Sequence, residues 1–100
     1  MAETAVETIV RRMVGHFAPE PTALADPDAL LLDDLGYSSL RLLELAFTLE
    51  DLFSMDPATM GEAPPVGTVG ELVAFLDERV AEGAASVPPM ENVDEALAAI

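Results

Sequence analysis

The sequence of 100 residues contains no cysteine and no lysine. Without cysteine the chain can form no disulfide, use no thiolate as a nucleophile and offer no cysteine ligand to a metal. No apolar run approaches the roughly 18 residues that a membrane-spanning helix needs. The first ten residues, MAETAVETIV, are acidic and amphipathic, unlike a signal peptide. We therefore expect a cytoplasmic protein with no membrane partner, and the length suits a single domain.

Positive charge is scarce. Asp and Glu number 19 against four Arg, which gives a formal net charge of −15. Nucleic-acid binders need clustered positive charge, so the composition excludes a nucleic-acid partner. The negative charge favours partners with basic patches and encounters that weaken with salt, although solubility alone could also explain it. The chain is expected to be a monomer.

Three segments carry apolar residues at helical spacing. The first covers residues 3–17 and the second, which is the strongest, covers residues 39–53. The third begins at Thr68, which can form a capping box with Glu71, and Gly83 is placed to stop it. These segments predict three long helices.

The connections are rich in proline and glycine. Residues 18–37 form a long first loop, whose leucines indicate that it is pinned onto the core. In the second break, Asp56 and Pro57 predict one short helical turn through Met60. No strand alternation is present. The sequence thus predicts an all-α fold, a small four-helix bundle with three long helices and one short helix.

The C-terminal end reads as an appendage. We assign residues 1–82 to the bundle and residues 83–100 to a linker and tail. Within the tail, Asn92 could cap a short helix over residues 92–100. An isolated helix of this length is marginal in water, so the tail could be disordered, dock to a partner or pack on the bundle.

The helix at residues 39–53 is apolar on two sides. Its core side comprises Leu42, Leu45, Ala46, Leu49, Leu52 and Phe53. Three further large residues, Leu40, Leu43 and Phe47, lie roughly opposite, flanked by Glu44, Glu50 and Asp51. The long loop could cover this second side, but an apolar centre with a charged rim favours a partner surface.

Two adjacent serines begin this helix. Tyr37, Ser38 and Leu42 fit a hydrophobic staple, which assigns Ser38 as the N-cap and Ser39 as the first helical residue. The hydroxyl of Ser39 is then free. It sits at the positive end of the helix dipole, a favourable place for a phosphate. On these grounds Ser39 is the better candidate for modification, and a phosphoester is the most natural one.

Residues 34–40, DLGYSSL, followed by Glu44-Leu45 and by LEDLF at residues 49–53, resemble the acyl carrier protein family. The family signature is an Asp-Ser-Leu triplet after a Leu-Gly corner, followed by a helix of the Glu-Leu…Leu-Glu-Glu-x-Phe type. The resemblance covers about residues 3–82. It implies the acyl-carrier type of bundle.

The resemblance also implies a function. The serine of the triplet, here Ser39, carries a 4′-phosphopantetheine arm derived from coenzyme A, whose thiol holds acyl cargo as a thioester. The protein itself is not an enzyme and has no catalytic residue. Its partners are a phosphopantetheinyl transferase and the acyl-loading, condensing and tailoring enzymes. The partner-binding positions implied after the serine are Leu40, Arg41, Leu43, Glu44, Phe47, Glu50 and Asp51.

Two departures from the family pattern bear on the pathway. Ser38 stands where the family usually has Asp, and Arg41 stands where fatty-acid carriers often have an acidic residue. They favour a discrete carrier from polyketide or nonribosomal peptide biosynthesis. Peptidyl carriers are typically less acidic and differ before the serine, so acyl cargo is favoured over aminoacyl cargo. The alternative from another class is an unmodified acidic adaptor that docks through the same helix. No metal site is expected, because the acidic loop lacks the EF-hand pattern.

Overall fold

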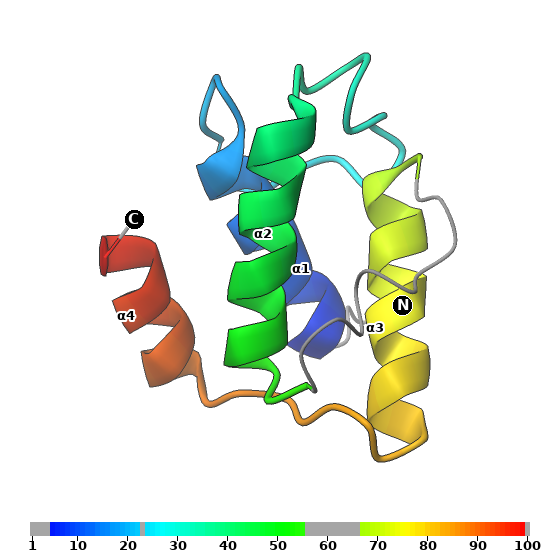
Figure 1. Cartoon of the computed structure of the whole chain (residues 1–100), viewed down its shortest axis with the longest axis vertical. Coiled ribbons are helices and arrows are strands. Elements are labelled where there is room, and N and C mark those ends of the chain that lie inside the picture. Colours follow the sequence, from blue (N-terminus) through cyan, green and yellow to red (C-terminus); the bar gives the residue numbers. More distant parts are fainter. Residues whose placement is uncertain (1–4, 23, 56–66, 100) are drawn as a thin grey trace.

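The computed structural model describes residues 5–22, 24–55 and 67–99. Within these ranges the chain forms four α-helices: α1 (Ala5–Phe17), α2 (Ser39–Leu52), α3 (Val69–Ala81) and α4 (Met90–Ala99) (Figure 1). The predicted all-α bundle is confirmed. The short helical turn predicted from Asp56 to Met60 lies outside the described residues.

Helix α1 is the centre of the bundle. It packs against α2, α3 and α4. Its apolar residues recur every three or four positions, and each is at most 3% exposed: Val6, Ile9, Val10, Met13, Val14 and Phe17. His16 lies in the last turn, where a positive charge suits the helix dipole.

The long first loop, residues 18–37, is hydrogen-bonded to α1 and to the segment before α3. Of the leucines that predict its attachment to the core, Leu31 is buried and Leu35 is partly buried, but Leu24, Leu30 and Leu32 are exposed. The backbone N–H of Thr22 donates to the Gly15 carbonyl at 3.0 Å, and that of Leu31 donates to the Gly67 carbonyl at 2.9 Å. A Cβ at Gly15 would lie 2.4 Å from the Thr22 carbonyl oxygen, so only glycine permits this approach. The loop therefore brings the start of α2 to a fixed place.

Helix α3 begins and ends as the sequence predicts. The Thr68 side chain accepts from the Glu71 backbone N–H, and the Glu71 side chain accepts from the Thr68 backbone, which completes the capping box. An isolated antiparallel bridge joins Thr68 to Leu30 of the first loop. Gly83, with φ 80°, follows the last turn and permits the left-handed conformation that stops the helix.

The C-terminal tail forms a helix that packs on the bundle. Helix α4 packs against α1 and α2 and lies on the other side of α2 from α3 (Figure 1). Val93 is fully buried, and Asp94 forms an ion pair with Arg12 of α1 at 2.8 Å. The segment before α4 is attached to the end of α2, because the Ser86 N–H donates to the Phe53 carbonyl at 2.8 Å.

The cap predicted for this helix is wrong. Helix α4 begins at Met90, so Asn92 lies inside its first turn. The Pro89 carbonyl accepts from the backbone N–H of Asn92 at 3.0 Å and of Val93 at 3.3 Å. The Pro89 carbonyl thus accepts the first hydrogen bonds of the helix, which begins directly after the Pro-Pro pair at residues 88–89.

Candidate functional site

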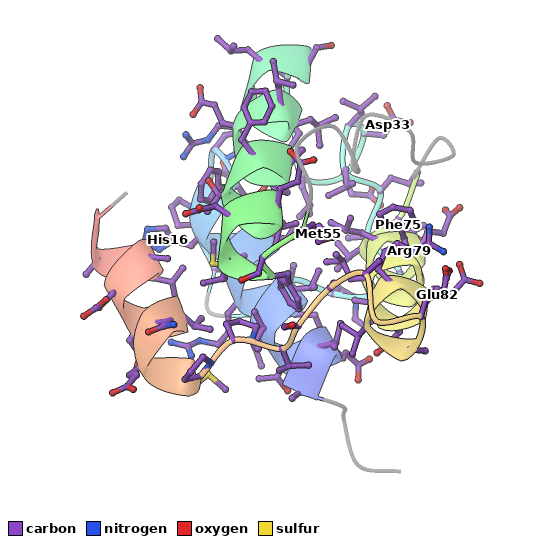
Figure 2. All side chains as sticks on the ribbon, turned by 60° about the horizontal axis from the view of Figure 1, so that its bottom comes forward. His16, Asp33, Met55, Phe75, Arg79 and Glu82 are labelled. Carbon is purple, nitrogen blue, oxygen red and sulfur yellow. The ribbon has the colours of Figure 1, made fainter. Side chains whose placement is uncertain are left out.

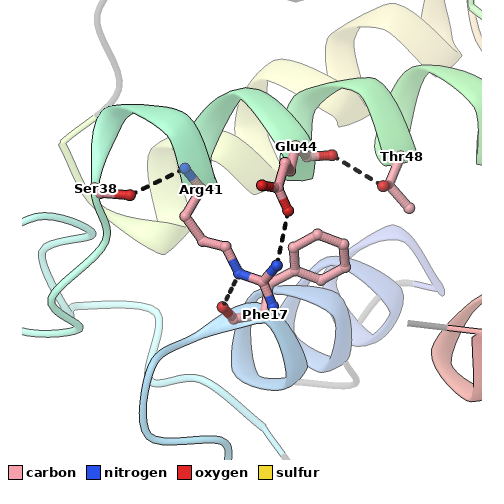
Figure 3. A network of polar contacts seen from close by, with 5 residues as sticks. All are labelled: Phe17, Ser38, Arg41, Glu44 and Thr48. Atoms are coloured by element: carbon pink, nitrogen blue, oxygen red, sulfur yellow. Dashed lines mark hydrogen bonds and ion pairs between the residues drawn. The ribbon is translucent and has the colours of Figure 1, made fainter.

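Ser38 and Ser39 have different environments at the start of α2. Ser38 has an extended backbone (φ −89°, ψ 165°), and its Oγ accepts a hydrogen bond from the Arg41 backbone N–H at 3.1 Å (Figure 3). Ser38 is therefore the N-cap, as predicted. Ser39 is the first helical residue and is exposed. Among the residues that the structure describes, none is hydrogen-bonded to the Ser39 hydroxyl.

The electrostatics of this helix end suit an anion at Ser39. The first turn of α2 contains no acidic side chain. No carboxylate of the turn itself therefore competes with a bound anion for the N–H groups and the positive end of the helix dipole. A phosphate joined to the exposed hydroxyl would be stabilised here.

Tyr37 anchors the chain just before the serines. It is 4% exposed, and its hydroxyl donates to the Val14 carbonyl of α1 at 2.5 Å. Leu42, on the next turn, is partly buried and packs against the same core. Burial raises the pKa of the Tyr37 phenol well above its usual range, and the positive charge of Arg41 partly opposes this rise.

The sequence indicates a free positive charge at Arg41 beside the second apolar side of the helix. In the structure Arg41 is instead engaged by other residues of the chain. Its Nε donates to the Phe17 carbonyl at 2.8 Å, and its Nη1 lies 2.8 Å from Glu44 Oε2 (Figure 3). The guanidinium also stacks over the Phe17 ring, 4.5 Å from the centroid. The charge of Arg41 is thus directed to the last turn of α1. Sequence reasoning missed Phe17 as a partner, because no local pattern links residues 24 positions apart.

The second apolar side of α2 is open. Leu40 is 67% exposed, Leu43 49% and Phe47 58%. The long loop therefore leaves these residues uncovered, which settles the alternative that the sequence left open. We call Leu40, Leu43 and Phe47 the apolar face of α2. Adjacent large exposed side chains of this kind mark interaction surfaces.

The acidic rim of this face is smaller than predicted. Glu44 and Asp51 are exposed, but Glu50 is only 6% exposed. After α2, Ser54 adopts a left-handed conformation (φ 54°), and the Met55 N–H returns to the Glu50 carbonyl at 2.8 Å. Beside this turn, Phe47, Glu50, Asp51 and Met55 line a hollow of about 230 Å³. An ideal projection of the helix does not show this burial, because it contains only the residues of the helix itself.

Within the ranges that the structure describes, no group of three or more His, Cys, Asp or Glu side chains is placed to hold a metal ion. None of the helices in those same ranges has both the length and the apolar character needed to cross a bilayer.

The fold and the site define a class of protein: a small acidic helical bundle with a free serine at the start of α2. Comparison with known proteins agrees with this description. Over 81 residues the chain is 35% identical to an acyl carrier protein of Zymomonas mobilis subsp. mobilis, covering 81% of this chain and all of the relative. No family model matches the chain, and no solved structure does. The chain belongs to the acyl carrier protein family, whose members are carriers rather than catalysts.

Proposed function

We propose that this protein carries acyl groups on a 4′-phosphopantetheine arm attached to Ser39. The observation that supports this most is the division of roles between the two serines. The Ser38 hydroxyl is engaged as the N-cap, whereas Ser39, the first helical residue, is exposed. The absence of acidic side chains from the first turn of α2 also suits the phosphate of the arm.

The attachment is a phosphoryl transfer from coenzyme A. The Ser39 oxygen forms a bond to the phosphorus that bears the pantetheine, and the pyrophosphate bond of coenzyme A breaks. The nucleotide half leaves as the 3′,5′-bisphosphate of adenosine, and the serine proton passes to a base of the transferase or to water. No oxidant or reductant is needed. When bound, the arm supplies a thiol that holds cargo as a thioester.

The chain itself contributes position and recognition. The hydrogen bonds of the first loop and the capped start of α2 hold the hydroxyl at the surface, and the apolar face lies along the same helix. We assign this face as the docking surface for the transferase and for the enzymes that load, condense and tailor the cargo. Glu44 and Asp51 supply its exposed negative charge. A docking enzyme with a basic patch would complement them.

We assign the carrier to polyketide or related natural-product biosynthesis, with acyl cargo. The support is the departure from the fatty-acid carrier pattern at Ser38 and Arg41. In the structure, Arg41 pairs with Glu44 and so reduces the free negative charge next to the apolar face. Fatty-acid synthesis enzymes with strongly basic patches would find fewer free carboxylates here. Aminoacyl cargo of nonribosomal peptide synthesis is the second candidate, and reconstitution with loading enzymes of each kind separates them.

Modification by a promiscuous phosphopantetheinyl transferase tests the proposed function. The purified chain is incubated with the transferase and coenzyme A, and its intact mass is measured. We expect one added phosphopantetheinyl group on the wild type and on Ser38→Ala, and none on Ser39→Ala. An unmodified wild type, or a modified Ser39→Ala, contradicts the assignment. An unmodified wild type that still binds partner enzymes through α2 would instead identify an adaptor.

A further inference from the structure

The segment with the two serines is attached to α1 on both sides. Before the serines, the Tyr37 hydroxyl donates to the Val14 carbonyl at 2.5 Å. After them, the Arg41 Nε donates to the Phe17 carbonyl at 2.8 Å. Both acceptors lie in the last turn of α1, where carbonyls lack intrahelical partners or share them. One helix end therefore fixes the beginning of the other.

Arg41 makes the larger number of contacts in this arrangement. Its planar guanidinium bonds the Phe17 carbonyl, stacks on the Phe17 ring and pairs with Glu44 at the same time (Figure 3). Its backbone N–H, in addition, is the donor to the Ser38 cap. A lysine could make one of these side-chain contacts but could not reproduce the stacked fork.

Arg41 cannot act on Ser39 by direct contact. Residues two positions apart on a helix do not face each other, and the Arg41 side chain is directed to α1. Its effect must pass through the backbone of the first turn of α2. Such a turn frays easily because its N–H groups have no helical acceptors. A bond from this turn to a fixed neighbouring helix limits the fraying.

We propose that Arg41 is a positioning residue for the modification of Ser39. This inference rests on the proposed function. By attaching the first turn of α2 to α1, Arg41 holds the Ser39 hydroxyl at a constant place relative to the apolar face, on which the transferase docks. Small misplacements of a reacting group cost large factors in rate, so the chemical step depends on this attachment.

A second arginine supplies a matched control. Arg79 of α3 stacks over the Phe75 ring, 5.1 Å from its centroid, and pairs with Glu82, three residues on (Figure 2). The exposure of its side chain, 26%, is close to the 34% of Arg41. In the described part of the chain, however, its buried Nε has no hydrogen-bond partner. Arg79→Gln thus removes a stack and an ion pair without detaching α2 from α1.

The test measures kcat and KM for phosphopantetheinyl transfer to wild type, Arg41→Gln, Arg41→Lys and Arg79→Gln, each checked for folding by thermal melting. We expect Arg41→Gln to lower kcat about fivefold or more with a smaller change in KM. Arg41→Lys should recover part of this loss, and Arg79→Gln should stay within about twofold of wild type at a similar melting shift. Hydrogen exchange in the first turn of α2 should accelerate in Arg41→Gln alone.

Arg41→Gln also frees the charge of Glu44, and a double variant separates that effect. If loss of position is the cause, Arg41→Gln/Glu44→Gln keeps the low kcat. A double variant with wild-type kinetics, or equal kcat for Arg41→Gln and Arg79→Gln, overturns the inference while leaving Ser39 as the attachment site. If Arg41→Gln does not fold, Arg41→Lys is compared with Arg79→Lys, with an expected loss of about twofold. An unmodified wild type overturns the proposed function itself.

Discussion

The two sides of α2 have similar chemistry and opposite environments. On the core side Leu45 is 2% exposed, and Leu49 and Phe53 are fully buried. On the apolar face Leu43 is 49% exposed and Phe47 is 58% exposed. Only the first set can stabilise the fold, because only it is removed from water. Apolar content therefore does not distinguish folding residues from recognition residues in so small a protein, whereas their position around the helix does.

The largest expected effect comes from replacing each of two phenylalanines, six residues apart on opposite sides of α2, by alanine. Phe53→Ala opens a cavity in a packed core and should lower the free energy of unfolding by about 3–5 kcal/mol. Phe47→Ala should change it by less than about 0.5 kcal/mol. Denaturant unfolding measures both. The comparison between the two sides fails if the two variants are equally destabilised.

Phe47 should matter for recognition rather than for stability. Phe47→Ala should raise the KM for the transferase severalfold, since central aromatic residues carry much of the energy of an interface. Leu24→Ala, which removes another exposed apolar side chain (42%) from the first loop, is the control. An equal KM for Phe47→Ala and Leu24→Ala would remove the docking role of the apolar face.

The pH dependence of stability tests how Tyr37 holds the start of α2. Burial raises the pKa of its phenol in the folded state above the unfolded value of about 10. The contribution of Tyr37 to the free energy of unfolding is complete below about pH 10. It is lost as the pH rises toward the folded pKa, because only the phenol of the unfolded state then ionises. Stability should fall by up to about 1.4 kcal/mol per pH unit above pH 10.

The composition makes this titration unusually clean. Tyr37 is the one tyrosine, and the chain has no lysine and no cysteine to titrate in the same range. Tyr37→Phe should show a flat profile above pH 10 and, at neutral pH, lose about 1 kcal/mol with the hydroxyl bond. A slope that persists in Tyr37→Phe would show that another group causes it.

The smallest expected effect comes from Ser54, in the turn that follows the C-terminal end of α2. Ser54 occupies a left-handed position (φ 54°) that glycine fills at lower cost. Ser54→Gly should stabilise the fold by about 0.5 kcal/mol, the relief of strain exceeding the entropy that glycine loses on folding. Thermal melting would show it as a small rise in midpoint. A fall would mean that the serine side chain is needed at this turn.

Much of the fold and part of the site follow from local patterns. Helical spacing predicts α1 and α2, the capping box predicts the start of α3, and the staple predicts Ser38 as the cap. Each depends on residues within a few positions of one another, which is the range over which sequence patterns are informative.

The features that were not predicted involve residues outside α2 itself. Glu50 is buried although the helix pattern places it in the acidic rim, and beyond the helix the Met55 N–H turns back to the Glu50 carbonyl. Arg41 faces α1 because the first loop places the Phe17 carbonyl and ring beside it. A helical projection of α2 contains neither Met55 nor Phe17. It therefore predicts the two sides of the helix correctly but not the environments of Glu50 and Arg41 at their edges.

Helix α4 is attached to the bundle by fewer contacts than the other helices make with one another around α1. Its ten residues form too short a helix to persist alone, and it is held by the buried Val93 and by an ion pair between two partly exposed side chains, Arg12 and Asp94. Such a unit opens at a lower free energy than the helices around the main core. We therefore expect α4 to detach from α1 and α2 before the rest of the bundle unfolds, which would expose the apolar side chains that Val93 contacts.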